Sequence, residues 1–156
     1  MAYFVTGATG FIGSYLVAKL VERSGPIYVL VRKQSLDRLA ELREAWGVDD
    51  KRVVAIVGDL GKPKLGVSAA DLRKLKGKVD HFFHLAAIYD LQASADDQQA
   101  ANVDGTRSAV EFAMAVGAGC FHHVSSIAWL SSAKHGVSTT SGSLASSAIS
   151  PSRSSA

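Results

Sequence analysis

The sequence predicts an α/β fold with a doubly wound parallel sheet that is incomplete on its C-terminal side. Short apolar runs rich in β-branched and aromatic residues alternate with longer amphipathic segments through the first 125 residues. This alternation is typical of parallel strands joined by right-handed crossover helices. A glycine-rich segment also follows the first apolar run directly. In a sheet of this type, ligands bind at the carboxyl ends of the strands, where the strand order reverses.

Five strands and four helices account for most of the chain. Apolar runs predict strands within residues 2–6, 27–31, 53–57, 79–87 and 121–125. Apolar residues at helical spacing predict helices at 10–23, 36–46, 68–76 and 96–117. The longest helix is expected to turn four side chains toward the core: Val103, Val110, Ala113 and Met114.

The character of the sequence changes after Ser126. Glu111 is the last acidic residue of the 156, and residues 131–156 contain 11 serines without helical or strand periodicity. A segment of this composition cannot bury enough apolar surface to form a packed core. We therefore predict a folded domain over residues 1–128 and a disordered, Ser-rich tail over residues 129–156.

Composition and charge argue against several classes of protein. The net charge of +3 comes from scattered basic residues, which does not favour a nucleic-acid surface. No apolar run approaches the roughly 18 residues that span a membrane, and no basic leader precedes the first strand. The single cysteine, Cys120, leaves no internal disulfide, so we expect a reducing, cytoplasmic setting. The oligomeric state is not indicated.

The strongest signal is the segment Thr6–Gly13, which reads T-G-A-T-G-F-I-G between the first strand and the first helix. A tight turn needs positive φ at Gly7, a pyrophosphate must approach the backbone at Gly10, and the helix must pack closely at Gly13. The helix N-terminus then offers unpaired N–H groups and a partial positive charge to phosphates. The residues predicted to bind the phosphates are Gly7, Thr9, Gly10, Phe11, Ile12 and Gly13.

The G-x-x-G-x-x-G spacing resembles that of the extended short-chain dehydrogenases/reductases, which carry a Rossmann-type dinucleotide-binding domain. Further segments resemble the same family in the same order: Gly58-Asp59-Leu60, His84–Ala87, Asn102–Thr106 and Val124-Ser125-Ser126. The resemblance implies that Asp59 reaches the adenine amino group and that the segment after His84 lines the cofactor through its backbone. The cofactor contacts that it implies are Asp59, Leu60, Leu85, Ala86, Ala87, Asn102 and Ser125.

The resemblance also implies hydride transfer between a nicotinamide and a carbonyl. Ser126 best matches the family's Ser or Thr that polarises the carbonyl, and its neighbour Ser125 is the alternative. The family's Tyr-x-x-x-Lys pair should follow further along, yet no tyrosine occurs after Tyr89. We therefore expect the N-terminal part of a reductase, read in the wrong frame or otherwise replaced from about Trp129. The alternative is a non-catalytic nucleotide-binding module.

Three segments resemble the acyl-CoA or carboxylic-acid reductase branch of the family: Leu30-Val31-Arg32 with nearby Ser35, Ala86–Asp90 and His122–Ala128. Members of that branch reduce a fatty acyl thioester to an aldehyde or alcohol with NADPH. The sugar-nucleotide epimerase/dehydratase branch and the flavonoid-type reductases are the alternatives. The resemblance thus implies a small-molecule carbonyl or acyl substrate bound beside a dinucleotide.

The end of the second strand favours NADP over NAD. NAD-specific domains place a carboxylate there, which accepts a hydrogen bond from the ribose 2′-hydroxyl. Here the strand ends in Arg32-Lys33, and no carboxylate occurs between Glu22 and Asp37. A guanidinium at this position can pair bidentately with the 2′-phosphate of NADP. We therefore predict that Arg32 and Lys33 bind the cofactor.

The five histidines do not predict a metal site. His122 and His123 are adjacent on one strand and must point to opposite faces, and His81 and His84 differ in face by strand parity. No cysteine pair and no group of carboxylates clusters with them in the sequence. We therefore expect no metal ligands in this chain.

Overall fold

The computed structural model describes residues 1–87 and 94–124. The chain divides into two units, Met1–Ser125 and Ser126–Ala156, and the second lies outside the described residues. The predicted disorder of the tail over residues 129–156 therefore stays a prediction.

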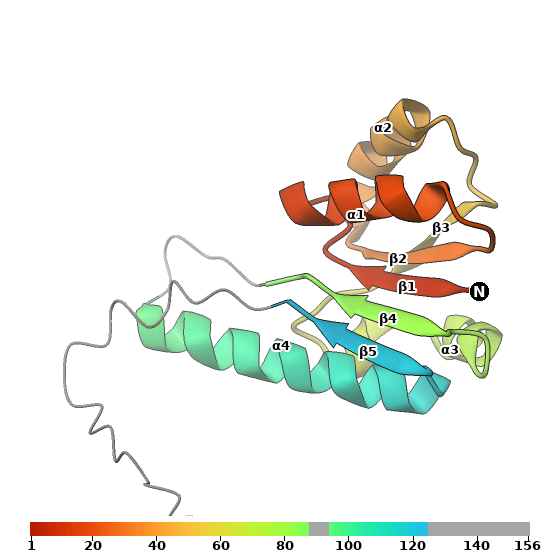
Figure 1. Ribbon diagram of the computed structural model, residues 1–156. Helices are drawn as coiled ribbons and strands as arrows, with labels where there is room; N and C mark the ends of the chain where they lie inside the picture. Colours follow the sequence, from red (N-terminus) through yellow and green to blue (C-terminus); the bar gives the residue numbers. More distant parts are fainter. Residues whose placement is uncertain (88–93, 125–156) are drawn as a thin grey trace, which may run out of the picture. The chain divides into compact units, whose positions relative to one another are not determined.

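A five-stranded parallel sheet forms the centre of the first unit (Figure 1). Its strands are β1 (Tyr3–Thr6), β2 (Ile27–Val31), β3 (Val53–Val57), β4 (His81–His84) and β5 (Cys120–His123). Their order across the sheet is β3-β2-β1-β4-β5. The chain first builds outward from β1 to β3 and then returns to place β4 on the other side of β1. The order therefore reverses between β1 and β4, which is where a doubly wound sheet binds its ligands.

Helices cover both faces of this sheet. They are α1 (Phe11–Val21), α2 (Leu36–Trp46), α3 (Ala69–Leu75) and α4 (Ala95–Val116), with short 3-10 turns η1 (Lys33–Ser35) and η2 (Pro63–Gly66). Figure 1 shows α1 and α2 on one side of the sheet and α3 and α4 on the other. The predicted fold class is confirmed, and each predicted helix agrees with the structure to within two residues at either end.

The fourth strand lies within the predicted range and occupies only its middle part. It ends at His84, although the apolar run continues to Ala87. Beyond His84 the backbone turns toward the end of β1, where the Ala86 N–H donates to the Thr6 hydroxyl at 3.2 Å. The strand ends here because the Ala86 N–H bonds to a side chain of β1 instead of continuing the backbone hydrogen bonds of the sheet.

Two apolar cores lie between the sheet and its helices. Alternate residues of each strand face opposite cores, so Tyr3 and Val5 point to the α1 side while Phe4 points to the α4 side. The core on the α1 side includes Val17, Leu20, Ile27, Val29, Val31, Leu39 and Val53. The core on the α4 side includes Ile56, Leu65, Leu75, Phe82, Ala109, Phe112 and Val116.

The inward face of α4 differs from the sequence prediction. Of the four predicted core residues only Ala113 is buried, whereas Met114 is 77% exposed and Val103 is 51% exposed. The fully buried positions are Ala109, Phe112 and Val116. Phe112 decides the rotation of the helix, since its ring packs on Phe4 at 5.2 Å between centroids, beneath the centre of the sheet. Helical periodicity alone could not decide which face of α4 is buried, because apolar side chains occur on both faces.

This assignment predicts contrasting effects for two neighbouring substitutions. Phe112→Ala should lower the free energy of unfolding by about 3–5 kcal/mol, since it empties a fully buried aromatic site. Met114→Ala should change it by less than about 0.5 kcal/mol, since that side chain lies in solvent. Urea denaturation followed by circular dichroism measures both. Equal losses in the two variants would contradict the observed rotation of α4.

Candidate functional site

The glycine segment forms a tight turn between β1 and α1. Gly7 has φ +75°, and a Cβ there would lie 2.7 Å from the backbone nitrogen of Ala86. Its carbonyl accepts the N–H of Gly10 at 3.0 Å, which closes the turn. Two constraints therefore require glycine at position 7: its positive φ, and the close approach of the segment after β4, which leaves no room for a side chain.

Gly13 and Gly10 have different surroundings. A Cβ on Gly13 would lie 2.0 Å from the Gly7 carbonyl oxygen and 2.8 Å from the Cα of Ala8. The close packing predicted at Gly13 is thus present, although its partner is the turn itself rather than the strand. A Cβ on Gly10 would meet only the Gly7 carbonyl oxygen, at 3.3 Å. Gly10 has an exposed, extended backbone (φ −80°, ψ 173°), so the protein itself leaves the space beside it open.

The N-terminus of α1 is uncapped and free of negative charge. Gly10 is its N-cap, no side chain accepts from its first turn, and no acidic residue lies there. The first N–H groups of a helix have no carbonyl partner within it, so they can receive an anion. The side chains of Phe11 (80% exposed) and Ile12 (58% exposed) point to solvent. These two predicted residues can therefore bind a phosphate only through their backbone N–H groups. Thr9, which is half-buried, can offer its backbone N–H in the same way.

A buried hydrogen-bond network lies beneath the turn. The Thr6 hydroxyl oxygen accepts the N–H groups of Leu85 at 3.3 Å and Ala86 at 3.2 Å. Its lone pairs are thus occupied, and it donates its proton to Nδ1 of His84 at 2.8 Å. The remaining ring proton must then be on Nε2 of His84, which donates to the Thr106 hydroxyl of α4 at 3.3 Å. Thr6 and His84 are the buried polar side chains of the described residues.

His84 is held in the neutral state by this position. Burial, with a smaller contribution from the neighbouring charge of His123, lowers the pKa of His84 from 6.5 to about 4. A second ring proton, on Nδ1, would also face the Thr6 oxygen, whose lone pairs are already occupied. The family resemblance predicted that the segment after His84 lines the cofactor. The structure shows that the His84 side chain itself fixes this segment to the turn.

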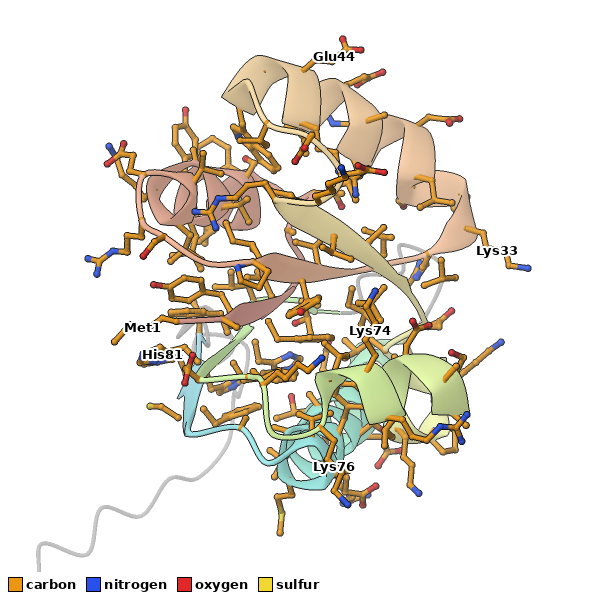
Figure 2. The ribbon with its side chains drawn as sticks, turned by 90° about the vertical axis from the view of Figure 1, so that its right-hand side faces the viewer. Met1, Lys33, Glu44, Lys74, Lys76 and His81 are labelled. Atoms are coloured by element: carbon orange, nitrogen blue, oxygen red, sulfur yellow. The ribbon has the colours of Figure 1, made fainter. Side chains whose placement is uncertain are left out.

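A pocket of about 290 Å³ opens beyond the ends of β2 and β3. It is lined by Arg32, Lys33, Gln34, Val57, Gly58, Asp59, Lys62 and Gly66. Three of these residues are basic and one is acidic, so the pocket carries a positive charge. Asp59 is engaged on both oxygens, since Oδ1 accepts the N–H of Gly61 at 3.0 Å and Oδ2 lies 3.8 Å from Nε of Arg32. Figure 2 shows Lys33 extending away from the domain.

Lys62 was not among the residues predicted from the sequence. It lies in the loop after β3, which is anchored by fully buried Leu65 and by a bond from the Asp59 N–H to the Leu65 carbonyl at 2.7 Å. Lys64 and Leu65 both adopt positive φ there, an arrangement that costs energy in residues other than glycine. The loop thereby folds back and places Lys62 in the same pocket as Arg32. No local signal marks this, since the placement depends on the burial of Leu65.

The other predicted residues fall into three groups. Leu85 and Ala86 are half-buried beside the turn, and Ala87 is exposed just beyond them. Leu60 is buried in the core against Gly105 of α4, where a Cβ would lie 2.9 Å from Leu60 Cγ, so its side chain cannot reach a cofactor. Half-buried Asn102 lies on α4 one turn before Thr106, while Ser125 and Ser126 lie outside the described residues.

A glycine turn, an uncapped helix N-terminus and a basic pocket therefore lie along the carboxyl ends of β1, β2 and β3. A family model described as "Male sterility protein", an NAD-binding family, matches residues 5–148. The chain belongs to this family. The match confirms the predicted reductase branch and continues past residue 128, where the sequence prediction ended the domain.

Curated relatives of this chain include an aminoadipate reductase and fatty acyl-CoA reductases. The large subunit of L-2-aminoadipate reductase from Penicillium chrysogenum is 34% identical over 134 residues, which cover 79% of this chain and 10% of that protein. Fatty acyl-CoA reductase 1 of Xenopus laevis is 36% identical over 120 residues, 66% of this chain and 23% of that protein. The chain thus spans only a small part of the curated relatives that it matches.

Solved structures support the same assignment. The terminal R domain from the myxalamid PKS-NRPS biosynthetic pathway matches with a TM-score of 0.66 at 30% identity, over 81% of this chain and 34% of that one. The reductase domain of a nonribosomal peptide synthetase from Mycobacterium tuberculosis matches with a TM-score of 0.65 at 26% identity, over 81% and 33%. Residues 1–87 and 94–124 therefore belong to the NAD(P)-binding domain of this reductase family. Within them, no helix has the length and apolarity to cross a bilayer.

Two substitutions in the turn separate ligand binding from folding. Gly10→Val should leave the fold intact, because the extended backbone at this position suits a β-branched residue. It should abolish dinucleotide binding, since the side chain fills the space that the pyrophosphate needs. Gly13→Val should instead unfold the turn, where a Cβ meets backbone. Circular dichroism and fluorescence titration with NADPH distinguish these outcomes, and normal binding by Gly10→Val would refute the phosphate site.

The lowered pKa of His84 makes stability depend on pH. Between pH 6.5 and 4 the unfolded chain binds a proton at His84 that the folded chain excludes, so acid favours unfolding. This group should cost about 2 kcal/mol of stability by pH 5 and about 3 kcal/mol by pH 4, all of it retained above pH 7. Imidazole NMR should show one of the five histidines titrating near pH 4. Five ordinary titrations above pH 6 would contradict the network.

Proposed function

We propose that this chain is the cofactor-binding part of an NADP-dependent reductase that acts on an acyl thioester or a related carbonyl. The observation that carries the proposal is the pocket at the ends of β2 and β3. Arg32, Lys33 and Lys62 line it together, where a dinucleotide on the glycine turn would place its adenosine ribose.

The ion pair between Arg32 and Asp59 leaves the guanidinium available. The two groups lie 3.8 Å apart, and their side chains are 48% and 38% exposed. An exposed pair at this distance contributes little stability. Arg32 can therefore turn to a 2′-phosphate, which accepts two charge-assisted hydrogen bonds from a guanidinium. Asp59, the single carboxylate of the pocket, is outnumbered by three basic side chains, so the pocket suits the 2′-phosphate of NADP better than the 2′-hydroxyl of NAD.

The proposed reaction follows from the family. NADPH supplies a hydride when bound, and the acyl carbon of a thioester accepts it. The carbonyl oxygen then needs a hydrogen-bond donor, a role that sequence resemblance gives to Ser126 or Ser125. Loss of the thiolate from the resulting tetrahedral adduct would leave an aldehyde. A second NADPH, together with a proton from solvent, would reduce that aldehyde to an alcohol. In the described residues, the glycine turn and the N-terminus of α1 bind the pyrophosphate, while Leu85, Ala86 and Ala87 border the path toward the nicotinamide.

A second candidate is a nucleotide-binding module without turnover. It is the alternative that the sequence analysis left open, since residues 124–156 contain no Tyr-x-x-x-Lys pair. The two candidates share the binding site and differ in one measurement. Oxidation of bound NADPH in the presence of a fatty acyl-CoA supports the reductase, whereas binding without oxidation supports the module.

The cofactor preference is tested by titration with NADPH and NADH. NADPH should bind more tightly by on the order of 10- to 100-fold, as expected for one charge-assisted bidentate contact. Arg32→Ala should remove most of this preference, and Lys62→Ala should remove part of it, with little change in NADH affinity. Arg38→Ala is the matched control, because Arg38 pairs with Glu41 on the exposed side of α2, away from the pocket. Equal affinities for the two cofactors in the unmodified chain would overturn the assignment.

A further inference from the structure

Three metal-ligating side chains meet at the end of the sheet opposite the glycine turn. His81 is the first residue of β4, and Cys120 is the first residue of β5. The two are paired across the strands, and His122 lies two residues further along β5. Because side chains alternate along a strand, all three lie on the same face of the sheet, which is the face of Tyr3 and Val5. Figure 2 shows His81 beside Met1, at the amino ends of the strands.

The ligand atoms of this cluster are close enough to share one ion. Nδ1 of His81 lies 3.1 Å from Nε2 of His122. One ring nitrogen of each histidine and the Cys120 sulfur all lie within 4.8 Å of one another. In a tetrahedral zinc site, Zn–N bonds of about 2.0–2.1 Å and a Zn–S bond of about 2.3 Å place the nitrogens about 3.3 Å apart and the sulfur about 3.6 Å from each. The two hydrogen-bonded nitrogens already lie close to this separation, so the adjustment that remains is mainly an approach of the Cys120 sulfur.

The two imidazole rings are held in place before any ion binds. His122 stacks on Phe83 at 4.4 Å with an interplanar angle of 11°, and His81 stacks on Tyr3 at 5.9 Å. These contacts restrict ring rotation, which lowers the entropy cost of binding. Cys120 is exposed, and both histidines are partly exposed. Solvent ions can therefore reach the cluster.

We propose that His81, Cys120 and His122 bind a divalent transition metal of the zinc class, with the fourth coordination position open. One thiolate and two imidazoles form a borderline-soft donor set that suits Zn²⁺ or Co²⁺ and disfavours Mg²⁺ and Ca²⁺, which require oxygen ligands. Binding displaces the thiol proton of Cys120 and breaks the hydrogen bond between the two rings. The prediction of no metal considered each histidine pair along its own strand, whereas this set comes from two adjacent strands. The site is independent of the cofactor proposal.

Cobalt substitution tests the proposal on the full chain. Because Cys120 is the only cysteine, any thiolate-to-cobalt charge-transfer band reports this residue. Titration with Co²⁺ under reducing conditions should produce that band together with the visible bands of tetrahedral coordination, and Zn²⁺ should displace both. Cys120→Ser should abolish the band, and His81→Ala and His122→Ala should each weaken metal binding by on the order of 100-fold. His123→Ala is the matched control, since its side chain lies on the opposite face, and it should retain binding.

The same experiment can overturn the site. A folded chain that gives no charge-transfer band with excess Co²⁺ refutes it, as does a band that survives both histidine substitutions. Circular dichroism of each variant shows whether it is folded. Zn²⁺ should also protect Cys120 from alkylation in the unmodified chain, and this second measurement needs no substitution. Alkylation at an unchanged rate in the presence of Zn²⁺ would contradict the proposal even if a variant failed to fold.

Discussion

The hydroxyl of Thr6 joins three segments that are far apart in the sequence. It lies at the end of β1, accepts the N–H groups of Leu85 and Ala86 after β4, and donates to His84, which in turn donates to Thr106 on α4. Each polar atom of Thr6 and His84 in this network is hydrogen-bonded, because an unpaired buried donor or acceptor would cost stability. The position of the glycine turn depends on this network, since the Gly7 backbone packs directly on Ala86.

The network lies where the strand order reverses, between β1 and β4. A doubly wound sheet opens a crevice there, since the crossovers on its two sides lead away in opposite directions. The glycine turn and the segment after His84 meet at this point of the sheet, where Gly7 packs on Ala86. The basic pocket lies further along the same edge of the sheet, at the ends of β2 and β3. The carboxyl edge of the sheet therefore carries the glycine turn and the basic pocket, while the amino edge carries the separate cluster of His81, Cys120 and His122.

Much of the fold and part of the site could be predicted from the sequence. Strands and helices were located because buried apolar periodicity is a local property, and the turn was found because Gly7 and Gly13 meet requirements that only glycine fulfils. The inward face of α4 was predicted wrongly, because both of its faces carry apolar residues and the packing of Phe112 on Phe4 decides between them. Lys62 was missed because its position depends on a loop that is anchored by the buried Leu65 side chain.

The sequence by itself determined the order of strands and helices, the glycine turn and the basic residues after β2, since each depends on neighbours within a few positions. Only the tertiary structure decided the roles of His84, Leu60 and Lys62, and the meeting of His81 with Cys120 and His122. The sequence assigned no role to the His84 side chain, which is a buried, neutral bridge in the fold. The reason is physical: parallel strands place residues side by side that are tens of positions apart, and burial then decides which of their polar atoms must pair with one another.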